Sequence, residues 1–299
     1  MTCINIQFTR FSAFYSPLIL TICKFLDEVG LDAKFSIAPQ GKSAIDALLD
    51  GSAHLVQSAL SQRLLSLEKG ENQLVLHFAQ INEMDGFFLS SRDQDNDFSW
   101  NKLIGKSVLV DHGNQPLAMF KYACKKAGIN FNDINIINAG NDSQMDSRFR
   151  DGTGDYIHQQ GPAPQQLEFD GAGHVVASIG EKIGKCAFSS LAATPEWLKT
   201  DSAKSFLKAY KKARAFINEA PASEVSAVLT CPYNEKALFN NIELSVLTKT
   251  IEFYQNLGCW SPHIEITRAS YEATLDIFEY DDQISTRYSY DDYCKSLVF

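Results

Sequence analysis

Several features that would assign a function at once are missing from this sequence. No apolar run is long enough to cross a bilayer, and the longest one, SPLILTICKFL, is interrupted by Lys24. We therefore expect no membrane insertion. The net charge of −9 also gives no basis for a positively charged binding surface, so we expect no nucleic-acid partner.

Motifs for metal, nucleotide and triad chemistry are missing as well. The six histidines stand singly, with no HExxH motif and no His/Cys spacing suited to zinc. Gly41-Lys42-Ser43 is similar to the end of a phosphate-binding loop, but Ser36 occupies the position of its first glycine. There is no GxSxG elbow. We therefore predict no metal, no cofactor and no catalytic residue.

The cysteines and the N-terminus leave the cellular location open. The seven cysteines are scattered singly and form no CxxC pair, which favours small buried thiols in a reducing compartment over a disulfide or a catalytic thiol. Met1-Thr2-Cys3 leads directly into the strand-like CINIQF, without a basic segment or a cleavage site. We expect a cytoplasmic protein if the sequence is complete as written, and a periplasmic or cell-surface protein if an export signal was removed.

The stretch Leu74–Ser91 organises the rest of the chain. Its ends, LVLHFAQI and GFFLS, are apolar and strand-like, and the polar NEMD separates them, which predicts two buried strands with a charged kink. A strand–helix–strand–helix–strand pattern precedes this stretch, and a second such pattern follows it from GKSVLVDHG. We interpret the stretch as the first crossover between two lobes, with the return crossover near Lys182–Phe188.

These patterns predict an α/β protein with two lobes, as the chain length also favours. Lobe I would comprise residues 1–88 and 187–299, and lobe II residues 89–186. Each lobe would hold a mainly parallel sheet flanked by helices, with a ligand cleft between the lobes. Ser16-Pro17 is expected to open the first helix, with Ser16 as its N-cap, and Gly30 to end it. The acidic, tyrosine-rich tail from Glu279 is expected to cover part of the surface.

The expected cleft also predicts a binding site. In open α/β sheets, ligands bind beyond the carboxyl ends of the strands, where helix N-termini offer free N–H groups. This rule and the polar kink select hydroxyls, amides, aromatic rings and charged groups that suit a small polar or planar ligand better than a covalent reaction. The predicted ligand-binding residues are Phe14, Tyr15, Ser16, Gly41, Lys42, Ser43, Ser58, Ser61, Asn82, Asp85, His112, Gly113, Asn114, His158 and Gln159.

Simpler roles are open for the serines and aromatic residues of this set. Ser16 and Ser43 each precede a helical pattern and could serve only as helix caps. Phe14 and Tyr15 suit core or rim packing as well as stacking on a ligand. Each of these residues therefore has a structural alternative.

The histidines and the kink residues have alternatives too. His112 and His158 lie in predicted turns at strand ends, where loops often carry function, although a structural role is equally common. Asn82 and Asp85 could be hinge residues whose hydrogen bonds differ between an open and a closed form.

A set of phrases, in order, covers most of the chain: FYSPLILTICKFLDEVGLDAKF, GKSAIDALLDGSAHLVQSAL, FSWNKLIGKSVLV, GTGDYI, GHVVASIG and LAATPEWLKTDSAKSFLKAYKKARAFI. In these phrases the chain resembles the type II periplasmic-binding-protein family, above all the nitrate-, taurine- and aliphatic-sulfonate-binding proteins and the pyrimidine synthase of thiamine biosynthesis. The resemblance implies two α/β lobes, a hinged cleft and a captured small-molecule ligand, usually delivered to a membrane ABC permease. We expect the chain to act as a monomer.

The resemblance also includes an enzyme, which is the alternative function. The pyrimidine synthase carries a CCCFC run where this chain has KCAFS at Lys185–Ser189, and it uses a lysine and a histidine where this chain has Gln57 and Ser61. Without the lysine, no Schiff base to pyridoxal phosphate can form. The resemblance therefore favours a solute-binding protein, the substrate-binding component of an ABC-type importer with a permease as its partner, over a cytoplasmic enzyme or metabolite sensor on the same scaffold.

Overall fold

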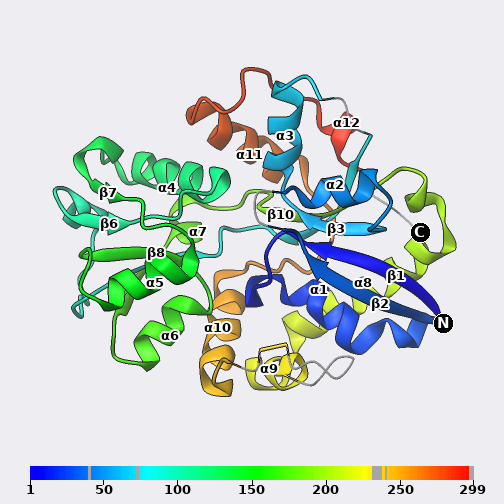
Figure 1. The fold of residues 1–299 in the computed structure, drawn as a ribbon, viewed down its shortest axis with the longest axis horizontal. Helices are drawn as coiled ribbons and strands as arrows, with labels where there is room; N and C mark the ends of the chain where they lie inside the picture. The colour runs from blue at the N-terminus through cyan, green and yellow to red at the C-terminus, as the bar shows by residue number, and fades with distance from the viewer. Residues whose placement is uncertain (40–41, 72–73, 231–237, 240, 296–299) are drawn as a thin grey trace.

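Two five-stranded sheets form the framework of the protein (Figure 1). The computed structural model describes residues 1–39, 42–71, 74–230, 238–239 and 241–295. We call the part of the chain built on the first sheet the first lobe and the part built on the second sheet the second lobe. The predicted two-lobed α/β fold is confirmed.

The first sheet has the strand order β2-β1-β3-β10-β4. Its strands are β1 (Thr2–Phe8), β2 (Leu31–Ile37), β3 (Leu55–Ser58), β4 (Leu76–Asn82) and β10 (Ser189–Ala193). β1 pairs in parallel with β2 and β3, whereas β10 runs antiparallel to β3 and β4. The helices α1 (Ser16–Leu20), α2 (Ala44–Leu49) and α3 (Leu60–Glu68) join its strands.

The second sheet repeats this arrangement, with the order β7-β6-β8-β5-β9. Its strands are β5 (Phe87–Ser91), β6 (Ser107–Leu109), β7 (Asn135–Ile137), β8 (Tyr156–Gln160) and β9 (His174–Ser178). β6 is parallel to β7 and β8, and β5 is antiparallel to β8 and β9. Its helices are α4 (Asn114–Ala127), α5 (Asp142–Arg150), α6 (Ala163–Phe169) and α7 (Ile179–Ile183).

Two crossovers connect the lobes. The predicted kink lies between β4 and β5, which belong to different sheets, and the chain returns between α7 and β10. All of residues 77–91 are buried. The first crossover and most of its two strands therefore lie inside the protein. The lobe boundaries at residues 88 and 187 stay a prediction, and β5 and β10 mark where each crossover joins its new sheet.

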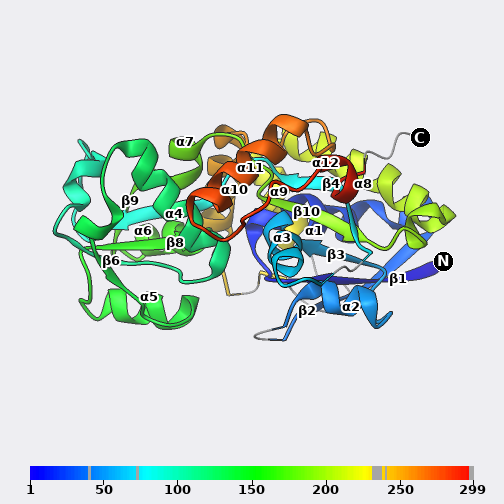
Figure 2. The same ribbon diagram turned by 90° about the horizontal axis from the view of Figure 1, so that it is seen from above.

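The C-terminal helices pack against both lobes. They are α8 (Asp201–Glu219), α9 (Ala222–Thr230), α10 (Leu244–Leu257), α11 (Arg268–Tyr280) and the short α12 (Tyr290–Tyr293). α10 contacts α9 and α6, while α11 contacts α3 and α4 (Figure 2). Each of these two helices therefore touches an element of both lobes.

The first helix differs from its prediction in detail. Pro17 lies in its first turn and Gly30 ends the segment with a left-handed φ of 75°, as expected. However, Tyr15 is the N-cap, and the Ser16 hydroxyl donates to the Ala13 carbonyl oxygen instead of capping the helix. The α-helix ends at Leu20 and continues through a π turn and a short 3-10 turn. Ser16 as the N-cap was therefore wrong.

Candidate functional site

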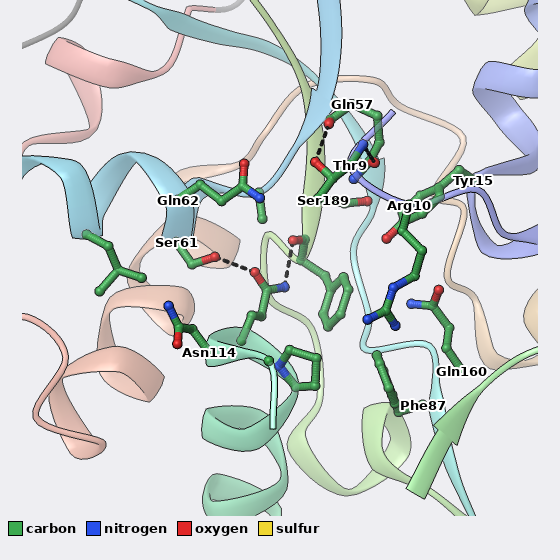
Figure 3. A pocket seen from close by; sticks show the side chains of 16 residues that line it. Thr9, Arg10, Tyr15, Gln57, Ser61, Gln62, Phe87, Asn114, Gln160 and Ser189 are labelled. Carbon is green, nitrogen blue, oxygen red and sulfur yellow. Dashed lines mark hydrogen bonds between the residues drawn. The ribbon is translucent and has the colours of Figure 1, made fainter. Parts of the chain in front are cut away.

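A cavity of about 240 Å³ lies where the two lobes meet (Figure 3). The first lobe contributes residues from the end of β1, from β3 and from the first two turns of α3; the second lobe contributes the start of α4 and the end of β8. Its lining residues are Thr9, Arg10, Tyr15, Gln57, Ala59, Ser61, Gln62, Leu65, Phe87, Gly113, Asn114, Gln115, Pro116, Gln160, Phe188 and Ser189. Most of the polar ones carry a hydroxyl or an amide, which can both donate and accept hydrogen bonds.

Two helix N-termini meet at this cavity, one from each lobe. Ala59 precedes α3 and Gly113 precedes α4, and neither helix has a side-chain cap. Because the first N–H groups of a helix have no partner inside the helix, such ends favour a ligand with acceptor or negatively charged atoms. The two lobes thus present the same chemistry to the cavity from both sides.

Arg10 is the one charged side chain among the described residues of this lining, and it is already paired. It crosses between the lobes to Asp111, at 3.1 Å, and to Asp142, at 3.5 Å. Burial lowers the pKa of Arg10, but Asp142 and Asp111 outweigh it and raise the pKa above its ordinary value. The guanidinium is therefore charged yet neutralised, which reduces its attraction for a further anion.

Aromatic rings provide the apolar part of the cavity. Tyr15, Phe87 and Phe188 line it, and the Arg10 guanidinium lies 6.0 Å from the centre of the Phe87 ring. Burial raises the pKa of Tyr15, so its hydroxyl stays protonated and can donate a hydrogen bond. A planar ligand could contact these rings while its edge bonds to the surrounding amides.

Direct hydrogen bonds join the lobes beside the cavity. The Ser61 hydroxyl of α3 donates to Gln115 Oε1 of α4 at 2.5 Å, and Gln115 Nε2 donates to the Phe188 carbonyl at 2.9 Å (Figure 3). The Ser12 hydroxyl also donates to the Gly161 carbonyl of the second lobe, at 2.9 Å. The described conformation is therefore one in which the lobes touch across the cleft.

A second cavity, of about 490 Å³, adjoins the first. Arg10 and Gln160 line both cavities and form the shared wall between them. The other walls come from the segment after β1, from α5, from the end of β8 and from the start of α6. They include Ser12, Asp142, Ser143, Asp146, Ser147, Arg150, Gln159, Gly161 and Gln166.

Some predicted ligand-binding residues lie in these cavities. Tyr15, Ser61, Gly113 and Asn114 line the first cavity, although they are far apart in the sequence. Gln159 lines the second cavity, where its Nε2 donates to Asp146 Oδ1 at 3.3 Å. Their role in ligand binding stays a prediction, and their placement agrees with the rule that selected them.

Phe14 and Ser16 were predicted to bind the ligand, but both lie in the core and line neither cavity. Phe14 is fully buried and its ring contacts Phe188 and Tyr254, while a Cβ added at Gly86 would clash with that ring. Phe14 thus supports the crossover instead of stacking on a ligand. Ser16, also fully buried, bonds to the backbone as described above.

Ser58 and His158 are also buried behind the cavity walls. The Ser58 hydroxyl donates to Gln62 Oε1 at 2.8 Å and so orients a lining amide. The His158 ring stacks on Phe87, with 4.6 Å between the ring centres. Burial lowers the pKa of His158 to about 3, so the ring is neutral and its role in this structure is packing.

Asn82 and Asp85, the predicted hinge residues, lie in the first crossover. Asn82 Nδ2 donates to the Ser189 hydroxyl at 2.7 Å, and Asn82 Oδ1 accepts from Trp260 Nε1 at 2.8 Å. Asp85 Oδ1 accepts from the Phe87 backbone N–H at 2.6 Å. Both side chains are fully buried and fix the two crossovers, so they do not line a cavity.

The remaining predicted residues that the structure describes line neither of these two cavities. Lys42 and Ser43 line a separate cavity beside α2, and Ser43 caps that helix by accepting from the Ile45 N–H. His112 is half-buried, and its Nδ1 bonds to the Val110 carbonyl at 2.7 Å. Gly41 lies outside the described residues. Ser43 thus serves as a helix cap, the simpler alternative, and its hydroxyl also donates to Gln62 Oε1 of the first cavity's lining at 3.5 Å.

Sequence reasoning missed several lining residues for an identifiable reason. Phe87 and Ser189 each open a crossover strand that runs antiparallel to its neighbours, so these strands present their amino ends to the cavity. A rule based on the carboxyl ends of strands cannot select them. Arg10, by contrast, follows the carboxyl end of β1, so this rule could have found it.

Three further expectations concern metal binding, the cysteines and membrane insertion. No group of three or more His, Cys, Asp or Glu residues suited to a metal occurs within the described part of the chain. Among the cysteines that the structure describes, Cys3, Cys124, Cys186, Cys259 and Cys294 are free thiols. Among the described helices, none is both long and apolar enough to cross a membrane.

Comparison with known proteins assigns the chain to a family. The model of the family described as "NMT1/THI5 like" matches residues 24–224. The chain belongs to this family. A relative, "Putative binding protein YtlA" of Bacillus subtilis (strain 168), is 26% identical over 97% of this chain and 86% of its own length.

Solved structures of other proteins share the architecture of this NMT1/THI5-like protein. The alkanesulfonate-binding protein SsuA of Xanthomonas axonopodis pv. citri, bound to MOPS, has a TM-score of 0.74 at 14% identity and covers 99% of both chains. The periplasmic nitrate-binding protein NrtA of Synechocystis PCC 6803 has a TM-score of 0.63 at 14% identity, covering 99% of this chain and 92% of its own. These likenesses bear on the fold, which is the periplasmic-binding-protein fold expected from the sequence.

Proposed function

We propose that this protein captures a small solute in the cavity between its lobes and acts as the substrate-binding component of an ABC-type importer. The observation that carries the proposal is the meeting of two uncapped helix N-termini, one from each lobe, at one cavity lined by amides and aromatic rings. Only an approach of the two lobes completes such a site, which is how hinge closure would couple to binding.

The lining favours a neutral planar solute, or a monoanion, over a dianion. Arg10 is already neutralised by Asp111 and Asp142, so the cavity offers partial positive charge from helix ends instead of a free cation. At about 240 Å³ the cavity is smaller than the roughly 300–1,000 Å³ of pockets for drug-sized ligands. A nitrate-, sulfonate- or taurine-type solute, or a heterocyclic thiamine precursor, would be of suitable size.

A thermal-shift screen with three classes of compound tests this ligand preference. A neutral aminopyrimidine and a monoanionic alkanesulfonate should raise the Tm, because a ligand that binds only the folded state stabilises it. Sulfate, a dianion, should have little effect. Strong stabilisation by sulfate alone would overturn the preference, and a compound that stabilises without bringing the lobes closer in solution scattering would count against capture by closure.

An importer function requires a location outside the inner membrane, so we also propose that a leader directs this chain to the periplasm or the cell surface. The codons upstream of Met1 and the neighbouring genes test this. An upstream export signal beside a permease gene is the expected result. Biosynthetic neighbours without such a signal would favour the alternative, a cytoplasmic enzyme or metabolite sensor on the same scaffold.

A further inference from the structure

Gln57 of β3 lies in the wall of the first cavity with its amide held in one orientation. The Thr9 backbone N–H donates to Gln57 Oε1 at 2.9 Å, and the Thr9 hydroxyl donates to the Gln57 carbonyl, also at 2.9 Å (Figure 3). Because a backbone N–H can only donate, the atom that faces it must be the amide oxygen. The amide nitrogen of Gln57 is therefore left to serve another partner.

This nitrogen has no acceptor within the described part of the protein, although Gln57 is only 3% exposed. Nε2 is not one of the unpartnered polar atoms that the described residues enclose completely, so it keeps accessible surface. Since Gln57 is otherwise buried and lines the cavity, that surface opens into the cavity. An acceptor atom of a bound solute would supply the missing hydrogen bond.

Gln62, in the first turn of α3, repeats the arrangement on the same wall. The Ser58 hydroxyl donates to its Oε1 at 2.8 Å, and the Ser43 hydroxyl donates to the same oxygen at 3.5 Å. Its Nε2 has no acceptor among the described residues and is not enclosed either. The uncapped start of α3 adds backbone N–H groups from the same lobe. The two amides, each able to donate and accept, thus offer only donors here.

Donors arranged in this way select a solute by its acceptor atoms. A carboxylate offers only acceptors, whereas an amidinium of the same shape offers only donors. The selection depends on the direction of the hydrogen bonds and not on a free positive charge, because Arg10 is paired with Asp111 and Asp142.

We propose that Gln57 and Gln62 are specificity-determining residues that bind the acceptor atoms of a planar, carboxylate-like head. The proposal rests on the proposed solute-binding function and adds the orientation of the solute. The end that carries acceptors faces β3 and α3 of the first lobe, and the rest of the solute faces the second lobe. A head that carries only donors is rejected, because it would meet the two amide nitrogens.

Calorimetric titration with benzoate and benzamidinium tests the proposal, because the two probes share a shape and differ in hydrogen-bond direction and charge. We expect the wild type to bind benzoate and not benzamidinium. Gln57→Glu keeps an acceptor for the Thr9 N–H but turns an oxygen toward the cavity. At about pH 8, where glutamate is ionised, it should weaken benzoate binding by roughly 10-fold or more and allow benzamidinium to bind.

A matched control separates this reversal from the added charge. Gln94→Glu introduces the same charge at an exposed position outside the cavity and should leave both affinities unchanged. If Gln57→Glu does not fold, Gln62→Glu should produce the same reversal. Loss of benzoate binding without a gain of benzamidinium binding in a folded variant would overturn the proposal, because loss of packing alone has that effect.

Failure of this inference can be told apart from failure of the proposed function. A wild type that carries a solute in native mass spectrometry, yet binds benzoate no better than benzamidinium, would disprove the inference alone. Equal effects of Gln57→Glu and Gln94→Glu would also disprove only the inference. A wild type that binds neither probe and carries no solute would contradict the proposed function as well.

Discussion

At the scale of single residues, Arg214 of α8 stands out as a charged side chain buried in the core. Its guanidinium is fully buried and donates to the backbone carbonyls of Ile81, Ser261 and His263, which joins β4 to the loop between α10 and α11. A buried cation needs hydrogen bonds to its donors, and here both terminal nitrogens of Arg214 are bonded while Nε has no partner among the described residues. Arg214 therefore holds a crossover strand in place from behind.

Replacing Arg214 with methionine should lower the free energy of unfolding by about 3 kcal/mol, because several buried carbonyls lose their donor. Urea unfolding followed by circular dichroism measures the change. Lys211→Met, at an exposed position of the same helix, is the matched control and should change stability by less than about 0.5 kcal/mol. Similar values for the two variants would contradict the structural role of Arg214.

Asp85 should give the protein a characteristic pH dependence. Burial raises the pKa of Asp85 to about 7, against the opposing hydrogen bond from the Phe87 N–H. In the unfolded chain the pKa is about 4. Between these values the folded state binds the extra proton, so its stability falls as pH rises through this window.

Asp85→Asn keeps an acceptor for the Phe87 N–H but cannot ionise. Relative to the wild type, we expect this variant to become more stable from pH 5 to pH 8, by on the order of 2–4 kcal/mol. Urea unfolding at both pH values measures this difference, with the exposed Asp93→Asn as control. A constant difference across the range would show that Asp85 is ionised in the folded protein.

At the scale of elements, the segment after α11 connects two helices that border the cavity. Asp281 accepts from Lys121 of α4 at 2.6 Å, and Gln283 Nε2 donates to the Asn114 carbonyl at 3.2 Å. Farther along, the Ser285 hydroxyl donates to Glu68 of α3 at 2.7 Å. The tail that was expected to cover the surface thus bridges the two lobes.

Breaking this bridge should favour the open form. The Lys121–Asp281 pair is partly buried, and an ion pair of this kind contributes about 1 kcal/mol, or about fivefold in population. Lys121→Met should therefore increase the radius of gyration of the ligand-free protein in solution scattering. Lys126→Met, an exposed change on the same helix, should not. An unchanged radius for both variants would mean that the bridge does not restrain opening.

Elements were easier to predict from the sequence than side-chain roles. The apolar runs on either side of NEMD are strands β4 and β5, and Gly30 ends the first helical segment with a left-handed φ of 75°, because periodicity and helix ends are local properties. Whether Phe14 packs in the core or Tyr15 lines the cavity depends on which face of a short turn meets the second lobe. The partners of these two residues lie more than a hundred positions away, Phe188 beside Phe14 and Gln160 in the same cavity lining as Tyr15, and no local pattern encodes such contacts.

At the scale of the whole molecule, the arrangement predicts two shapes. Ser61–Gln115, Arg10–Asp111 and Ser12–Gly161 are contacts between lobes that must break when the cleft opens. A solute that fills the cavity favours the closed form by its differential affinity for that form. Scattering should therefore show a smaller radius of gyration with bound solute than without it, and equal radii would exclude capture by hinge closure.

The most direct test of solute capture is native mass spectrometry of the freshly purified protein. We expect the wild type to carry a small molecule at a stoichiometry of one, and Asn114→Trp, which places a large ring at the cavity lining, to lose it. Asn101→Trp, an exposed change elsewhere in the second lobe, should keep it. A solute that stays bound to Asn114→Trp as firmly as to the wild type would contradict the assignment of the interlobe cavity as the binding site.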